Sequence, residues 1–347
     1  MKRLIIDDAI PFLEGRLEND FECINMPGEK ITRNDLLDAD GLLVRTRTRC
    51  DRNLLEGTPV KFVATGTIGL DHIDTHYCDS AGIRWQNAPG CNAPAVAQYV
   101  WRALLELGFD PKRMTLGVVG KGNVGSVVVD WGRRLGAKVI VCDPPRAERG
   151  LKDEDYIPLQ QLMSEADAVS FHTPLIKSAG LDPFGYFMQP TLHLADEAAL
   201  KCLRPGAILV NAARGGVVDE VALGKIRDEK GLKTAIDTWE SEPRLNPAHL
   251  PFADIATFHI AGYSRQGKER ATYAILAGLE KHFGIVLPKD NLEAPYKASE
   301  NLSEASIIAS YDIKADDSLM RKEYPDFERL RNTYPLREET ESIGKRH

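Results

Sequence analysis

Residues 120–125 read Gly-Lys-Gly-Asn-Val-Gly, and this stretch decides the fold class of the 347-residue chain. It fits the pattern G-x-G-x-x-G, which alone is weak evidence because chance matches are common. Its surroundings make it specific: residues 114–119 have the apolar pattern of a buried strand, and residues 123–135 have that of a helix. We therefore expect a strand–turn–helix unit in which the glycines permit a tight turn and the helix amides face a pyrophosphate.

The strand expected next, at 137–142, is followed by Asp143, 23 residues after Gly120. A carboxylate at this position accepts hydrogen bonds from ribose hydroxyls and repels a 2′-phosphate, so the sequence favours NAD over NADP. Arg146 lies close enough to weaken this preference, although it is more typical of a surface arginine. The alternative, an ordinary βαβ turn with a solvated aspartate, explains less of the pattern. Cofactor contacts are expected from Gly120, Gly122, Asn123, Val124, Gly125 and Asp143.

Short apolar segments alternate with helical segments over most of the chain, which predicts parallel α/β sheets with helices on both faces. In the first ninety residues we expect strands at 2–6, 41–44 and 60–64, and a helix at 10–17. A helix at 93–107 leads to the second unit, where further strands are expected at 168–172, 207–211, 234–236 and 255–258. Helices are expected at 197–203 and 220–228, with a long amphipathic helix at 265–283.

The last 60 residues, 288–347, differ from the rest in combining dense charge with many aromatic side chains. They are too aromatic for a solvated tail and too few for a self-sufficient domain. We expect this segment to pack on the body of its own chain or on a partner subunit.

The composition excludes several classes of protein. The chain has 44 Lys+Arg against 51 Asp+Glu, a net charge of −7, which argues against nucleic acid or an anionic membrane as its main partner. No apolar run approaches the roughly 18 residues of a membrane-spanning helix, and no signal-peptide stretch follows Met1. The six cysteines form no C-x-x-C pair and no zinc-type cluster, so we expect no metal site and reduced thiols in a cytosolic protein.

Three residues at the ends of expected strands carry the groups that hydride transfer from an alcohol requires. Arg214 follows the strand at 207–211, Glu242 follows the strand ending near Asp237, and His259 follows the strand at 255–258. Ligands gather outside the carboxyl ends of parallel strands, where a base, a carboxylate and a cation would converge. Each residue alone is more often structural; the three together behind a dinucleotide pattern favour a catalytic site.

The chain resembles the D-isomer-specific 2-hydroxyacid dehydrogenases over nearly all of residues 1–285. The similarity rests on residues 67–74 (TIGLDHID), 87–90 (NAPG), the glycine loop, residues 211–216, and the order Arg214, Glu242, His259. It implies a flavodoxin-like substrate domain, at 1–94 and 264–287, which encloses a Rossmann NAD domain at 95–263. Both domains would be doubly wound parallel sheets.

The resemblance also implies roles for single residues. His259 would take the proton of the C2 hydroxyl, Glu242 would orient and stabilise the imidazole, and Arg214 would bind the substrate carboxylate. Further cofactor contacts would come from Thr173, Ala212, Ala213, Arg214, Asp237 and Gly262. Substrate contacts would come from Thr46, Thr67 and Tyr263.

Residues 142–146, 170–175, 192–197 and 259–264, with the C-terminal extension, are similar to a branch of the family that acts on a small phosphorylated 2-hydroxy acid. This similarity implies a homodimer formed through a small α+β domain at 288–347. The phosphate needs a cation, and Arg45, Arg47 and Arg49 would share one side if the strand at 41–44 continued. We favour Arg45; the alternative is a basic edge strand.

Two residues depart from the family pattern. Lys121 replaces a small apolar residue in the glycine loop, where it would either reach the pyrophosphate or point to solvent. Gln98 replaces a common glutamate. Two other functions remain open: another D-2-hydroxyacid dehydrogenase, such as one acting on 3-phosphoglycerate, and a non-catalytic NAD-sensing protein. The presence of Arg214, Glu242 and His259 favours an enzyme, because a sensor needs no proton acceptor.

Overall fold

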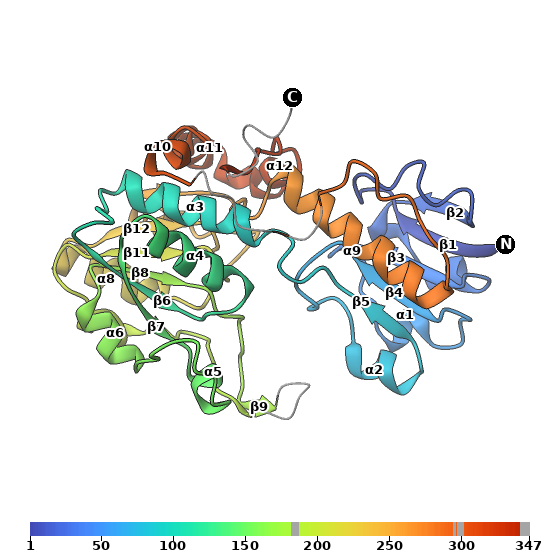
Figure 1. The fold of residues 1–347 in the computed structure, drawn as a ribbon, viewed down its shortest axis with the longest axis horizontal. Coiled ribbons are helices and arrows are strands. Elements are labelled where there is room, and N and C mark those ends of the chain that lie inside the picture. Colours follow the sequence, from blue (N-terminus) through green and yellow to red (C-terminus); the bar gives the residue numbers. More distant parts are fainter. Residues whose placement is uncertain (182–186, 294–295, 297–301, 341–347) are drawn as a thin grey trace. The chain divides into compact units, whose positions relative to one another are not determined.

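The computed structural model describes residues 1–181, 187–293, 296 and 302–340. The chain divides into two compact units, and each contains one large parallel sheet (Figure 1). The first unit comprises Met1–Asn92 and Ser264–Lys297; the second comprises Ala93–Tyr263 and Ala298–His347. The split first unit is interrupted by the second, and the C-terminal residues belong to the second.

The sheet of the first unit has the strand order β2-β1-β3-β4-β5, with every pair parallel. Its strands are β1 (Lys2–Asp7), β2 (Phe21–Met26), β3 (Gly41–Val44), β4 (Phe62–Thr65) and β5 (Arg84–Gln86). This is the flavodoxin-like order, in which the chain reverses its direction of winding between β1 and β3. The carboxyl ends of those two strands therefore mark the expected ligand position in this unit.

Helices cover both faces of this sheet. Leu4 packs in a cluster with Ile275 and Leu279 of the long helix α9 (Arg265–Phe283), whereas its neighbour Ile5 packs in another cluster with Leu54. Successive side chains of a strand point to opposite faces, which explains the continuous apolar run of β1. The remaining helices are α1 (Arg52–Leu55), α2 (Thr75–Ser80) and the short 3-10 helices η1 (Gly28–Lys30) and η2 (Arg33–Leu36).

The helix expected at 10–17 is wrong, because these residues form a series of turns. Phe12 and Gly15 have positive φ angles of 61° and 76°, which a right-handed helix does not accommodate. Leu13 and Leu17 are buried, so the apolar spacing that resembled a helix instead anchors the turns to the core. β2 and β5 are strands that the sequence interpretation did not include.

The second unit has a six-stranded parallel sheet with the order β13-β12-β11-β8-β6-β7. Its strands are β6 (Thr115–Val119), β7 (Lys138–Cys142), β8 (Ala168–Phe171), β11 (Ile208–Asn211), β12 (Lys233–Ile236) and β13 (Ile255–Ala256). Winding reverses between β6 and β8, as in a Rossmann sheet. An isolated parallel bridge between Val141 and Tyr156 lies where a third strand would pair with β7.

Both faces of this second sheet are also covered. A Cβ at Gly117 would lie 2.6 Å from Leu162 of α6, whereas the adjacent Val118 would lie 3.5 Å from a Cβ at Gly125 of α4, on the opposite face. The helices of this unit are α3 (Ala93–Glu106), α4 (Asn123–Arg134), α5 (Pro144–Glu148), α6 (Leu159–Glu165), α7 (Glu197–Cys202), α8 (Glu220–Lys230) and the 3-10 helix η3 (Pro247–Phe252). β9 (Gly180–Leu181) and β10 (Phe187–Met188) form a separate antiparallel pair.

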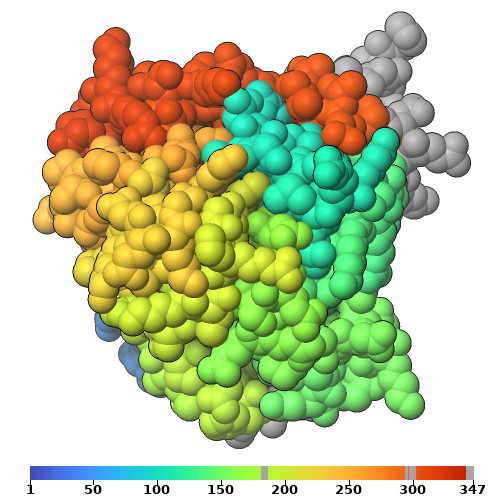
Figure 2. Space-filling model, turned by 90° about the vertical axis from the view of Figure 1, so that its left-hand side faces the viewer, coloured from blue at the N-terminus to red at the C-terminus, as the bar shows by residue number. Residues whose placement is uncertain are grey.

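The described part of the C-terminal segment is helical. It contains α10 (Glu304–Ile308), α11 (Ile313–Glu323), the 3-10 helix η4 (Tyr324–Asp326) and α12 (Phe327–Asn332). Figure 2 shows these helices (red) against α3 (cyan), and Ile307, Ile313 and Met320 join the core of the second unit. Within residues 302–340 the segment is mainly helical and Arg337 lies in a β-bridge, so the expected α+β character stays a prediction. Residues 294–295, 297–301 and 341–347 of the expected dimerisation domain lie outside the described residues.

All six cysteines are free, and four of them are buried. Among the helices that the structure describes, none combines the length and the apolar character needed to cross a bilayer.

Candidate active site

The glycine loop has the close approaches that its sequence predicts. Gly120 follows β6 with a φ of +90°, and a Cβ there would lie 2.9 Å from the carbonyl oxygen of His172. A Cβ on Gly125 would lie only 1.9 Å from the carbonyl oxygen of Gly120. A larger residue at Gly120 would push the loop away from His172, and one at Gly125 would separate the loop from the helix that follows it. Gly122, in contrast, faces open space, as a loop that admits a ligand should.

Among the residues that the structure describes, no side chain caps the first amides of α4. Gly122 is the N-cap residue, Asn123 is exposed, and Val124 is half-buried in the first turn. α7 and α8, by comparison, begin at Asp196 and Asp219, whose carboxylates accept amide hydrogen bonds. The first amides of a helix attract negative charge, so the α4 terminus fits a dinucleotide pyrophosphate.

Two polar atoms beside this loop are buried without a hydrogen-bond partner among the described residues. They are Oγ1 of Thr173 and Nδ1 of His172, just beyond the end of β8. Burial lowers the pKa of His172 to about 3, so its ring is neutral, and Nε2 lies 2.9 Å from the hydroxyl of Ser170. A buried hydroxyl without a partner is costly, and a ligand group would satisfy it. Thr173 is therefore placed as a cofactor contact should be.

Asp143 follows β7 and holds the glycine loop in place. Its Oδ2 accepts the backbone N–H of Lys121 at 2.7 Å, and its Oδ1 accepts that of Arg146 at 3.1 Å at the start of α5. The side chain is half-buried and keeps further acceptor capacity, because each carboxylate oxygen has two lone pairs. It thus retains acceptors for the ribose hydroxyls of a bound dinucleotide.

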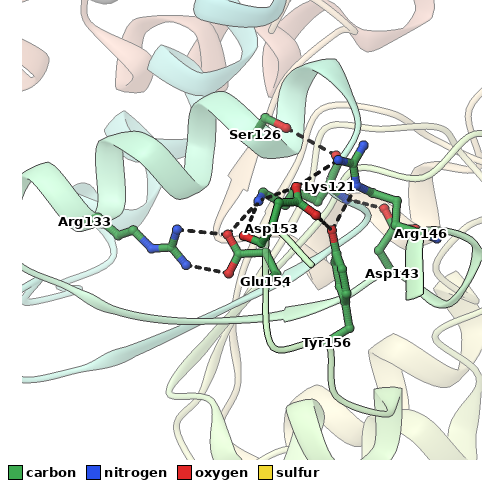
Figure 3. Close-up of polar contacts among 8 residues, drawn as sticks. All are labelled: Lys121, Ser126, Arg133, Asp143, Arg146, Asp153, Glu154 and Tyr156. Atoms are coloured by element: carbon green, nitrogen blue, oxygen red, sulfur yellow. Dashed lines mark hydrogen bonds and ion pairs between the residues drawn. The ribbon is translucent and has the colours of Figure 1, made fainter. Parts of the chain in front are cut away.

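The side chain of Lys121 points neither to the amides at the start of α4 nor into solvent (Figure 3). Its Nζ lies 3.0 Å from Oδ2 of Asp153 and 2.6 Å from Oε1 of Glu154, and its side chain is only 11% exposed. Arg146 donates to the same Asp153 oxygen at 2.9 Å and to the hydroxyl of Tyr156. Hydrogen bonds from Tyr156 and Lys121 lower the pKa of Asp153. The positive charges of Lys121 and Arg146, both near the glycine loop, are therefore balanced by carboxylates of the same chain.

His259 and Glu242 form the pair that the sequence predicts. Nδ1 of His259 lies 2.7 Å from Oε2 of Glu242, and the other carboxylate oxygen accepts the backbone N–H of Trp239 at 2.7 Å. The carboxylate only accepts hydrogen bonds, so Nδ1 carries the hydrogen and the lone pair is left on Nε2. The side chains are 25% and 18% exposed, so both are mostly screened while His259 remains accessible. The arrangement fits a general base with an orienting carboxylate.

Asp237 holds the backbone around His259. It is fully buried, and its carboxylate accepts the N–H groups of Ile260 at 2.8 Å and Ala261 at 3.0 Å, and the hydroxyl of Thr257. Its own carbonyl accepts the N–H of His259 at 2.8 Å. Asp237 was expected to contact the cofactor; in the structure both of its carboxylate oxygens bind within the chain. Gly262 lies in the turn that follows.

The loop with Arg214 lies against the loop with Glu242. Oδ1 of Asn211 accepts the N–H of Ala213, and Nδ2 of Asn211 donates to the carbonyl oxygen of Arg214, which fixes the chain between Asn211 and Arg214. A Cβ on Gly215 would lie 1.9 Å from the carbonyl oxygen of Trp239, so only glycine permits this contact. Ala212 and Ala213 are buried, whereas Arg214 is half-buried. The backbone thus brings the segments of the three expected catalytic residues together.

The residues expected to bind substrate are divided between the units. Arg45 lies at the end of β3 and donates to the carbonyl oxygen of Ala9 at 3.0 Å, which places it at the winding reversal of the first sheet. The alternation expected for Arg45, Arg47 and Arg49 is wrong, because β3 ends at Val44 and the chain turns at 46–48. Thr46 lies exposed in that turn.

Thr67 belongs to a hydrogen-bonded chain that the sequence interpretation missed. Its hydroxyl lies 2.8 Å from that of Thr65, which in turn lies 3.0 Å from Nε2 of the buried His72. Burial lowers the pKa of His72. The polar residues at the end of β4, Thr65, Thr67 and His72, were the available indication.

Tyr263, in the second unit, packs against the C-terminal segment. Its ring makes an edge contact with that of Tyr334, with centroids 6.2 Å apart, and the guanidinium of Arg331 lies 5.8 Å from its centroid. Sequence reasoning did not anticipate this contact, nor that of Arg337 with the carbonyls of Ile260 and Ala261. No local sequence pattern indicates either of these two contacts, because the partners are about seventy residues apart along the chain.

Comparison with known proteins gives three findings. Residues 92–261 match the family model for the D-isomer specific 2-hydroxyacid dehydrogenase NAD binding domain. The erythronate-4-phosphate dehydrogenase of Salmonella schwarzengrund is 40% identical, with 98% of this chain and 93% of that protein aligned, and its Bacteroides fragilis namesake is 40% identical with 97% of each. The solved structure of the TT0316 protein of Thermus thermophilus gives a TM-score of 0.68 at 26% identity, covering 82% of this chain and 98% of that one.

Proposed function

Because the chain belongs to the D-isomer specific 2-hydroxyacid dehydrogenase family, we propose that it oxidises 4-phospho-D-erythronate at C2, with NAD as the hydride acceptor. The product is the 2-oxo acid, 3-hydroxy-2-oxo-4-phosphooxybutanoate, and the step serves pyridoxal 5′-phosphate (vitamin B6) biosynthesis. The observation that carries the proposal is the 40% identity, across 98% of the chain, to a protein named for this activity.

His259 acts as the base. With Nδ1–H directed to Glu242, the lone pair on Nε2 takes the proton of the C2 hydroxyl. The imidazolium that forms is stabilised by the Glu242 carboxylate, which is itself held by the N–H of Trp239. Carbonyl formation at C2 then proceeds without releasing a proton directly into water.

Arg214 binds the substrate carboxylate and the oxygen on C2. Its planar guanidinium makes two parallel hydrogen bonds with a carboxylate, a geometry that lysine does not reproduce. The Asn211 contacts and the glycine at 215 hold the backbone on both sides of it. Arg214 therefore presents its charge from a fixed loop.

NAD fits the second unit. The residues that would hold it are the amides at the start of α4, Asp143, Thr173, and the backbone at Ala212 and Ala213. When bound, it supplies an acceptor for the hydride that leaves C2. Asp143, Asp153 and Glu154 place negative charge around Lys121 and Arg146, which suits a ribose hydroxyl better than a 2′-phosphate.

Arg45 binds the phosphate of the substrate. It lies at the winding reversal of its sheet, where ligands of such sheets bind, and its guanidinium keeps donors beyond the one given to Ala9. Thr46 and Thr67 are the further substrate contacts from this unit, and Tyr263 is the one from the second unit.

The test is NADH absorbance with a panel of 2-hydroxy acids: 4-phosphoerythronate, erythronate, 3-phosphoglycerate and D-lactate. We expect 4-phosphoerythronate to give the highest kcat/KM, by at least about tenfold. A higher value for 3-phosphoglycerate would indicate a different dehydrogenase of the family. Tight NADH binding without turnover of any acid would indicate an NAD-sensing protein. Near-normal activity in His259→Gln would remove the mechanism.

We also propose a cytosolic homodimer that forms through residues 288–347. The free thiols of all six cysteines fit a reducing compartment, and Ile308 of α10 is an exposed apolar side chain, 50% accessible, on the outer face of this segment. Mass measurement in solution tests the dimer. The Ile308→Glu variant should be monomeric and still bind NADH; an unchanged mass would place the interface elsewhere.

A further inference from the structure

The turn that follows His259 is held from two opposite directions. The N–H groups of Ile260 and Ala261 donate to the carboxylate of Asp237, at 2.8 and 3.0 Å. The carbonyl groups of the same two residues accept from the guanidinium of Arg337, with 2.8 Å between Nη1 and the Ile260 oxygen. The backbone N–H and carbonyl groups of two consecutive residues are thus all bound by two buried charged side chains.

Arg337 comes from the C-terminal segment and is itself fixed on every side. It is 7% exposed; Nη2 also donates to the carbonyl of Ala95 at 3.0 Å, and Nε donates to Oε1 of Gln98 at 3.2 Å. Its guanidinium stacks over the ring of Tyr311, 4.8 Å from the centroid. A buried guanidinium is expensive unless its donors are satisfied, and here Nε and both terminal nitrogens have acceptors. Gln98, which departs from the family pattern, is one of the acceptors.

The turn needs such support because its own secondary structure is minimal. β13 has only two residues, and His259 adopts a positive φ of 60° three residues after it. A left-handed conformation costs a non-glycine residue about 1 kcal/mol or more, and persists only where the surroundings determine it. The carbonyl of Ile260 accepts the N–H of Tyr263 at 2.9 Å within the turn and also accepts from Arg337, and the carbonyl of Ala261 accepts from Arg337.

We infer that Arg337 is a positioning residue for the reaction: it fixes the turn that aims the His259 imidazole, and so makes the C-terminal segment part of the catalytic apparatus of its own chain. This inference rests on the proposed function, because it requires His259 to be the base. Displacing a base by about 1 Å costs on the order of a hundredfold in rate, while the expected cofactor contacts other than Gly262 lie in other loops. Loss of Arg337 should therefore lower kcat far more than it raises KM.

The experiment compares Arg337→Met and Arg337→Lys with wild type, with kcat expressed per NADH-binding site measured by fluorescence titration. We expect Arg337→Met to lower turnover per site about 100-fold, with the NADH Kd and the substrate KM within about threefold of wild type. Lysine, whose single ammonium makes fewer of the bonds, should restore part of the loss. Substrate deuterated at C2 should show a larger isotope effect on kcat in Arg337→Met, because the chemical step becomes slower.

Arg321→Met is the matched control. Arg321 belongs to the same segment and also donates to backbone carbonyls, those of Ala253 at 2.7 Å and Leu250 at 3.3 Å, but before β13 instead of after His259. The Arg321→Met variant should be less stable than wild type but have the same turnover per NADH-binding site. A purely structural role for Arg337 would reduce the number of NADH sites and leave both turnover per site and the isotope effect unchanged.

Turnover per site within threefold of wild type in Arg337→Met would overturn the inference. If that variant does not fold, Arg337→Lys decides: its turnover per site must lie at least fivefold below wild type. The proposed function is tested separately, by the activity of wild type and of His259→Gln. An inactive His259→Gln with a fully active Arg337→Met would reject the positioning role alone.

Discussion

Nδ1 of His259 lies 2.7 Å from Oε2 of Glu242, and Oε1 of Glu242 lies 2.7 Å from the N–H of Trp239. One carboxylate thus connects the imidazole to the backbone at the end of β12. In Glu242→Gln one acceptor becomes an amide that donates, so the imidazole loses its orientation and its counter-charge. We expect kcat to fall on the order of 10³-fold at neutral pH. NADH fluorescence should give an unchanged Kd; a kcat within tenfold of wild type would show that the pair is not catalytic.

Arg45 gives a prediction about substrate choice. Arg45→Met removes the guanidinium at the end of β3, and we expect the KM for 4-phosphoerythronate to rise about 10- to 100-fold, the value of a charge-assisted hydrogen bond. Erythronate without the phosphate should be affected less than threefold. Arg49→Met is the control, because Arg49 is exposed and paired with Asp51 at 3.0 Å. Equal changes for both substrates would exclude Arg45 as the phosphate ligand.

Lys121 gives a prediction that separates structure from cofactor binding. Lys121→Met leaves Glu154 paired with Arg133, and leaves the backbone N–H to Asp143 intact. We therefore expect the free energy of unfolding to fall by about 1–2 kcal/mol and the NADH Kd to change less than threefold. Lys201→Met, which removes an exposed pair with Glu197, should cost under about 0.5 kcal/mol. A tenfold weaker NADH affinity in Lys121→Met would instead place its ammonium on the pyrophosphate.

Asp316 gives a prediction about pH. Burial raises its pKa to about 6, despite the hydroxyl of Tyr334 and the charge of Arg337, which lower it; Asp237 and Asp312 also raise it. The folded chain therefore holds this proton at pH values where the unfolded chain, with an ordinary aspartate near 3.8, has released it. The contribution of Asp316 to the free energy of unfolding is fully present below about pH 4 and is lost as the pH rises through 6. The loss is at most about 3 kcal/mol.

The variant Asp316→Asn lacks this titration. Urea unfolding at pH 4, 5 and 7 should show that the free energy of unfolding of Asp316→Asn rises relative to that of wild type between pH 4 and pH 7. Asp228→Asn, at a 75% exposed carboxylate, should show no such trend. A constant difference between Asp316→Asn and wild type would mean that Asp316 titrates normally.

The sequence predicted those parts of the molecule that depend on local pattern. The helix expected at 265–283 is α9 to the residue, because Ser264 caps its start and Gly284 ends it in a left-handed conformation. The strands of the second sheet were placed within one or two residues, since fully buried parallel strands are short apolar runs. The pairing of His259 with Glu242 followed from their positions after neighbouring strands.

The features that were missed depend on contacts distant along the chain. The apolar residues at 10–17 have helical spacing, but Phe12 adopts a positive φ and the segment forms turns. The same apolar side chains reach the core from these turns. The side-chain direction of Lys121 is set by Asp153 and Glu154, more than thirty residues later. The neighbours of Asp237 in the sequence carry no indication that its carboxylate binds the turn after His259. Such choices are decided by tertiary packing and not by propensity.

Arg337 follows Ile260 by 77 positions, and this order has a consequence for a chain emerging from the ribosome. Every strand of the six-stranded sheet has been synthesised by Ala256, so the nucleotide-binding layer can assemble while the remaining residues are still being made. The carbonyls of the turn at Ile260 and Ala261 receive their guanidinium only after Arg337 has been synthesised. A message terminated early would therefore yield a polypeptide that captures dinucleotide yet does not turn it over.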